Sequence, residues 1–94
     1  MPYIKQEQRT LLDPLIDPLA EQVLELASHS TQDQTKDGAF NYCITRLALK
    51  LFGKKGYSQF VRVAGNLEEA KAEYRRRVVV PYEDDKLSEN GDVY

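Results

Sequence analysis

Residues 39–52, AFNYCITRLALKLF, predict the fold class. Their apolar side chains recur at the three- and four-residue spacing of one helix face. This main stripe consists of Phe40, Cys43, Ile44, Leu47, Ala48 and Leu51. The opposite face mixes apolar and hydrogen-bonding side chains, namely Asn41, Thr45, Leu49 and Phe52, with Tyr42 and Arg46 on its flank. A face open to water would carry more charge. We therefore expect a helix that is covered on two sides.

A longer apolar stripe follows downstream and keeps its phase through Gly65. It predicts one helix from about 59 to 80, which Pro81 should end because proline lacks an N–H and clashes with the preceding turn. The alternative is a break at Gly65, with Asn66 capping a new helix. We prefer the continuous helix because the stripe does not change phase.

Two Asp-Pro pairs, at 13–14 and 17–18, mark the N-terminal part of the chain. Aspartate followed by proline is a favourable helix start. We expect a short helical turn within residues 3–12 and then a helix that begins at one of the two pairs and fades near His29. Residues 28–38, SHSTQDQTKDG, contain no large apolar side chain and predict a mobile polar loop.

The end of the chain, PYEDDKLSENGDVY, is acidic but also carries aromatic and aliphatic side chains. Asn90-Gly91 is a turn signal within it. We expect residues 83–94 to form an ordered acidic tail that packs on the helices. The whole chain, residues 1–94, is thus predicted to be one all-α domain, a small helical bundle of two long helices and one or two short ones.

Length and composition exclude several classes of protein. The chain has 94 residues, one cysteine and one histidine, which leaves no internal disulfide and too few ligands for an ordinary zinc centre. There is no phosphate-binding glycine motif, no apolar run of membrane-spanning length and no signal-peptide core, so we expect a cytoplasmic protein. We also expect no cofactor and no bound metal. No nucleophile–base pair can be placed from the sequence, which argues against an enzyme.

The net charge of −2 hides an uneven distribution. Residues 1–35 carry −4, residues 36–77 carry +6 and residues 78–94 carry −4. The acidic ends can neutralise the basic middle within one fold or across a subunit interface. Alternatively, part of the basic surface stays free and attracts an anionic ligand. Dedicated nucleic-acid binders are usually basic overall, and the sequence pI of 5.4 argues against that class.

One group of side chains could hold a small anion. Arginine forks suit phosphates and tyrosine rings stack on bases. The candidate ligand-binding residues are Tyr42, Arg46, Tyr74, Arg75, Arg76 and Tyr82. We expect them to gather where the two long helices meet the C-terminal tail.

Three segments together resemble a known group of proteins. They are DG-AF-NYCITRL at 37–47, EYRRRVV-PYED-K at 73–86 and the terminal ENGDVY at 89–94. They are similar to a family of short uncharacterised proteins of bacteriophages and bacteria, a domain of unknown function. The resemblance implies an all-α fold, a phage or prophage setting and, for a phage protein, the host cytoplasm. It implies no activity and no functional residue.

Two functions therefore compete. In the first, the protein is a non-enzymatic binder that sequesters an anionic nucleotide-like molecule, as an anti-defence protein would do with an immune signal. In the second, it is a helical protein-interaction module or an inhibitor of a host protein. In both, two amphipathic helices make a thin core for this length, so we expect a homo-oligomer, most simply a dimer. Arg46 should be buried and paired with a tail carboxylate, such as Glu89 or Asp92, or with the C-terminal carboxylate of Tyr94.

Overall fold

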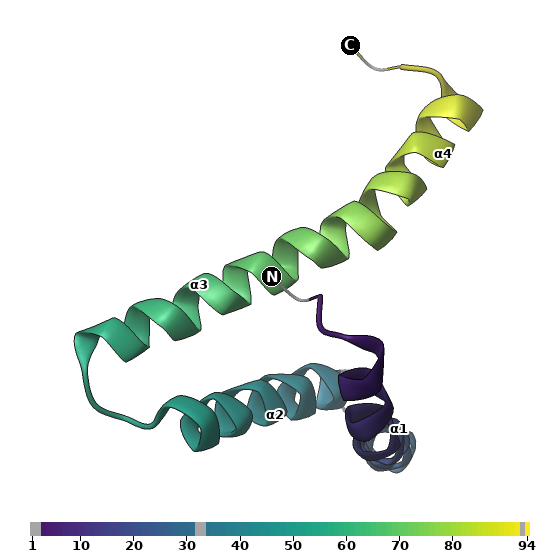
Figure 1. Cartoon of the computed structure of the whole chain (residues 1–94). Helices are drawn as coiled ribbons and strands as arrows, with labels where there is room; N and C mark the ends of the chain where they lie inside the picture. Colours follow the sequence, from purple (N-terminus) through teal and green to yellow (C-terminus); the bar gives the residue numbers. More distant parts are fainter. Residues whose placement is uncertain (1–2, 32–33, 93) are drawn as a thin grey trace.

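The computed structural model describes residues 3–31, 34–92 and 94, and these ranges contain helices and no strand. The elements are α1 (Gln6–Ser28), α2 (Thr35–Phe52), α3 (Tyr57–Tyr74), the π-helical segment η1 (Arg75–Val79) and α4 (Val80–Asn90). The predicted all-α class is confirmed. Figure 1 shows α1 and α2 crossing as a pair, while α3, η1 and α4 follow one another as a single long arm that leads away from them.

Helix α1 runs without interruption through both Asp-Pro pairs, with Pro14 and Pro18 inside it. The expected start at either pair is therefore wrong. The helix begins earlier, at a turn where the side chain of Gln8 accepts a hydrogen bond from the backbone N–H of the capping residue Lys5, at 2.9 Å. Each proline removes one helical hydrogen bond and its ring crowds the carbonyl four residues back, which costs about 3 kcal/mol in a helix interior. The contact of α1 with α2 holds the helix together past them.

The arm is continuous from Tyr57 to Asn90, which confirms the predicted continuity through Gly65. The prediction that Pro81 ends the helix is wrong. Pro81 follows directly after η1, in which the N–H of Val80 bonds to the carbonyl of Arg75, five residues back. This wider turn shifts the backbone partners ahead of the proline, so the helix can continue past a residue that has no N–H.

Helix α2 begins at Thr35, so the last residues of the predicted 28–38 loop are helical. Asp37 lies in the first turn, where a negative charge is favoured by the helix dipole. The N–H of Gly38 bonds to the carbonyl of Gln34 at 3.0 Å. Residues 32–33 of the predicted loop lie outside the described residues. At the other end of α2, Gly53 has a φ of 76° and caps the helix as expected.

The acidic segment from residue 83 does not fold back in the single chain. Residues up to Asn90 form α4, which contacts η1 and no other described element. Up to Asn90, the expected packing of the acidic tail (residues 83–94) on the bundle is therefore not made within one chain. The cause is the unbroken helix, which carries the acidic segment away from α1 and α2 (Figure 1).

No described side chain is fully buried, so the chain has no closed core of its own. Its radius of gyration is 17.0 Å, whereas a compact domain of this length has one of about 12–13 Å. Its accessible surface is 8557 Å², about 3,000 Å² more than expected for a compact protein of this mass. Helix α2, which we expected to be covered on two sides, remains partly exposed along its stripe, since Leu47 is 58% and Leu51 66% exposed. Among the described helices, none is both long and apolar enough to cross a membrane.

Candidate functional site

The six predicted ligand-binding residues divide between two parts of the molecule. Tyr42 and Arg46 belong to α2. The other four lie on the arm: Tyr74 ends α3, Arg75 and Arg76 are in η1, and Tyr82 is in α4. Helix α2 has no contact with η1 or α4. The single chain therefore does not bring Tyr42 and Arg46 together with Arg75, Arg76 and Tyr82.

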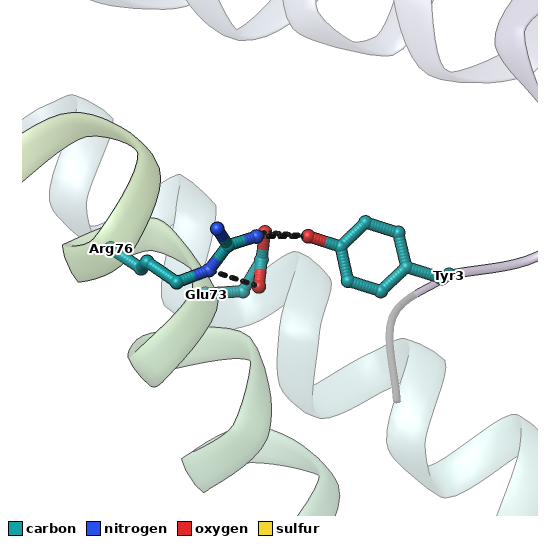
Figure 2. A network of polar contacts seen from close by, with 3 residues as sticks. All are labelled: Tyr3, Glu73 and Arg76. Atoms are coloured by element: carbon teal, nitrogen blue, oxygen red, sulfur yellow. Dashed lines mark hydrogen bonds and ion pairs between the residues drawn. The ribbon is translucent and has the colours of Figure 1, made fainter.

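Arg76 takes part in a polar network that joins the N-terminal segment to the arm. Its guanidinium lies 2.8 Å from Glu73 Oε1 and donates from Nε to Oε2 at 3.4 Å. The hydroxyl of Tyr3 donates to the same carboxylate and accepts from the same guanidinium (Figure 2). Hydrogen bonds from Tyr3 and Arg76 stabilise the ionised carboxylate and lower the pKa of Glu73. In return, the bond to Glu73 raises the pKa of Arg76.

The neighbouring arm residues are also engaged. Arg75 forms an ion pair with Glu83 at 4.0 Å, about two turns further along the arm. The ammonium of Lys86 lies 5.6 Å from the centre of the Tyr82 ring, on the same helix. The arm thus satisfies Arg75, Arg76 and the Tyr82 ring from its own residues and from Tyr3.

A hollow of about 840 Å³ lies between α1 and α2. Most of its lining is apolar, and the main side chains are Ile16, Leu19, Val23, Phe40, Ile44 and Leu47. A smaller hollow of about 320 Å³ adjoins it and shares Val23, Tyr42 and Cys43. The apolar stripe expected to form the core thus lines an open surface, which is why sequence reasoning did not assign it to a site.

Arg46 lines this apolar hollow but is exposed, which contradicts the prediction that it is buried. No carboxylate in the described ranges lies within ion-pair distance of it. The expected partners, Glu89 and Asp92, are at the far end of the arm, and Glu89 pairs with Lys86 at 3.2 Å. The reason is again the unbroken helical arm, in which α4 contacts only η1.

Little in this arrangement supports bond-breaking chemistry. His29 ends α1 and lies 2.7 Å from Glu25, as a helix-end residue. Cys43 is a half-buried free thiol between α1 and α2. Within the described part of the chain, no group of three His, Cys, Asp or Glu side chains is placed to hold a metal ion. An open hollow with an apolar lining and a few polar groups can take a small molecule or the apolar side chains of another polypeptide.

Comparison with known proteins gives a family and no activity. The model of a protein family, the domain of unknown function DUF6899, matches residues 1–93. Neither a curated protein nor a solved structure matches the chain. Because the match covers nearly the whole sequence, this chain belongs to the DUF6899 family.

Proposed function

We propose that this protein is a non-enzymatic helical interaction module that binds another polypeptide in the hollow between α1 and α2. One observation carries the proposal: large apolar side chains line the hollow and remain exposed. Phe40 is 65% exposed, Leu47 58% and Ile16 54%. Contiguous exposed apolar surface of this kind marks interaction sites in soluble proteins.

The surface area of the chain supports the same function. Its excess of about 3,000 Å² over a compact protein is on the scale of obligate interfaces, which bury roughly 2,000–5,000 Å² in total. Burial of apolar surface stabilises by about 25 cal/mol per Å². A partner that covers the hollow would therefore supply the core that the single chain lacks.

Capture of an anionic nucleotide-like molecule, or of an immune signal, has less support. Its predicted residues lie on two separate parts of the chain, and Arg75 and Arg76 already have carboxylate partners. Calorimetry with a panel of nucleotides tests it directly. Binding that is lost in Arg76→Ala and kept in Arg62→Ala would favour the nucleotide function over the interaction module.

The interaction module is tested with defined helical peptides. A displayed library of amphipathic helices is selected against the full chain, and binders are measured against Leu47→Asp and Leu51→Asp. Both leucines are on α2, but only Leu47 lines the hollow. We expect Leu47→Asp to weaken binding by about 100-fold, because it places a charge in an apolar interface, and Leu51→Asp to weaken it much less. A compact monomer with a radius of gyration of about 12–13 Å in X-ray scattering would contradict the proposal.

A further inference from the structure

We infer that the hollow between α1 and α2 is filled by α4 of a second copy of this chain, and that the exchange is reciprocal in a two-fold dimer. The inference rests on the proposed function, because it names the polypeptide that the hollow binds. Charge, shape and the course of the arm each support it.

Most of the charged side chains that line the hollow are basic. Lys36, Arg46 and Lys50, all on α2, line it together with one carboxylate, Asp37. None of these three cations forms an ion pair with a described residue. On the arm, by contrast, four cations have local ion pairs: Lys71, Arg75, Arg76 and Lys86. The hollow thus offers an apolar floor with unmatched positive charge.

Helix α4 has the complementary character. It carries the carboxylates Glu83, Asp84, Asp85 and Glu89 against the single cation Lys86. Val80 and Leu87, seven residues apart, lie on one face and are 42% and 45% exposed. At about 100° per residue, Glu83 and Asp84 flank that face on either side. An apolar stripe between carboxylates is what an apolar groove with a basic edge accepts in helix-in-groove recognition.

The dimensions also agree. At 1.5 Å per residue, α4 is about 16 Å long. The stretch of α2 from Lys36 to Lys50, which borders the hollow, spans about 21 Å. The acidic helix therefore fits along the hollow within its length.

A chain cannot place its own α4 in its own hollow. The arm is a continuous helix from Tyr57 to Asn90, about 50 Å long, and α4 at its far end contacts only η1. Figure 1 shows the C-terminal end leading away from α1 and α2. Folding back would require breaking this helix. A second copy needs no such break, and a two-fold axis makes both contacts equivalent, so that each copy gives one α4 and receives one.

This arrangement would also meet the sequence expectation for Arg46. Its tail carboxylate partner would come from the other subunit. The acidic segment would then pack on a helical pair, as its composition suggests, but across the interface. The basic segment of one copy, residues 36–77, would then face the acidic segment of the other, residues 78–94.

A charge-swap experiment on the full chain tests the inference. The first variant, Arg46→Glu/Lys50→Glu, makes the hollow acidic. The second, Glu83→Lys/Asp84→Lys, makes the docking face of α4 basic. Each alone should weaken self-association by about 10–100-fold in sedimentation equilibrium, because like charges then meet at the interface. An equal mixture of the two should recover association, since each acidic hollow then meets a basic α4 and each basic hollow meets an acidic α4.

The matched control is Asp85→Lys/Glu89→Lys, which changes the same number of charges on the opposite face of α4. It also removes one local ion pair, Lys86–Glu89, as the second variant removes Arg75–Glu83. We expect it to weaken association several-fold less than the second variant. Far-UV circular dichroism confirms that each variant remains helical.

Three results would overturn the inference. In the first, the wild-type chain stays monomeric at 100-fold the concentrations used for the variants. In the second, the control variant weakens self-association as much as the second variant does. In the third, the equal mixture of the two variants does not recover self-association. The first result leaves the proposed function standing if helical peptides still bind the hollow in a manner sensitive to Leu47→Asp. If neither peptides nor a second copy bind, the proposed function fails as well.

Discussion

The α1/α2 pair and the α3–η1–α4 arm are both helical and both open to solvent, yet different forces hold them. The arm carries short-range ion pairs along its length: Glu68–Lys71, Glu73–Arg76, Arg75–Glu83 and Lys86–Glu89. The pair carries one comparable contact, Glu25–His29, and otherwise depends on apolar packing. Exposed ion pairs contribute only about 0.2–1 kcal/mol each. A partner should therefore stabilise the α1/α2 pair more than the arm. Substitutions in the pair should accordingly change the free energy of unfolding most.

The sharpest test of this difference is Phe40→Ala. In the single chain Phe40 is 65% exposed, and an exposed substitution changes the free energy of unfolding by less than about 0.5 kcal/mol. If a partner covers the hollow, the ring is buried in the assembly and its loss costs about 3–5 kcal/mol. We expect the larger value in urea denaturation at tens of micromolar protein.

The control is Tyr57→Ala at the start of the arm. Tyr57 is 81% exposed and lines neither hollow. Its substitution should leave the free energy of unfolding nearly unchanged. Equal effects of the two substitutions would remove the distinction between pair and arm.

Proline provides the next comparison. Pro18 is in the interior of α1 with ordinary α-helix around it, and Pro18→Ala should stabilise the helix by up to about 3 kcal/mol. Pro81 follows the π-helical turn, which already accommodates the missing N–H, so Pro81→Ala should stabilise the arm less. Chemical denaturation followed by circular dichroism measures both. A larger gain at Pro81 would mean that η1 does not relieve the proline.

Sequence reasoning predicted the helices where a stripe was long and unbroken. The class, the stripe of α2, the capping by Gly53 and the continuity through Gly65 were all available from periodicity and glycine position. The predictions based on proline were wrong. By local sequence preference, an Asp-Pro pair predicts the start of a helix and Pro81 predicts its end. In the structure the helix continues through all of these prolines, because α1 packs on α2 and because η1 makes a wider turn ahead of Pro81.

The site was harder to predict than the fold. Periodicity identifies apolar faces but does not say whether the same chain covers them, so Phe40 and Leu47 were assigned to a core and not to an open hollow. The charge blocks were correctly located, but their partners depend on the direction of α4. That direction follows from η1, which has no strong sequence signal ahead of Pro81.

A smaller effect is expected at Gly65, in the middle of α3. A Cβ built there meets no heavy atom within 4 Å, and its φ is not in the left-handed region. Gly65→Ala should therefore stabilise the arm by about 0.5–1 kcal/mol, mainly by restricting the unfolded chain. Gly53→Ala is the control, because its φ of 76° strains any side chain and should make that variant less stable. If Gly65→Ala instead destabilises an assembled form, the arm is in close contact with a partner at this residue.

The smallest expected effect concerns the link between the two parts of the chain, in which Tyr3 bonds to Glu73 and Arg76. The lowered pKa of Glu73 means that its ionised form is favoured in the folded state. The stabilising contribution is therefore present above the ordinary glutamate pKa and is lost as the pH falls through the lowered folded-state pKa. Tyr3→Phe removes the main cause of the shift, so the pKa of Glu73 should rise towards its ordinary value and the link should open at a higher pH. Carboxyl ¹³C chemical shifts of Glu73 across an acid titration measure this, with Tyr57→Phe as the control hydroxyl. The 2.8 Å contact between Arg76 and Glu73 does not need Tyr3, so part of the lowering should persist in the variant. An unchanged titration in Tyr3→Phe would show that Arg76 alone sets the pKa, and that Tyr3 does not join the N-terminal segment to the arm in solution.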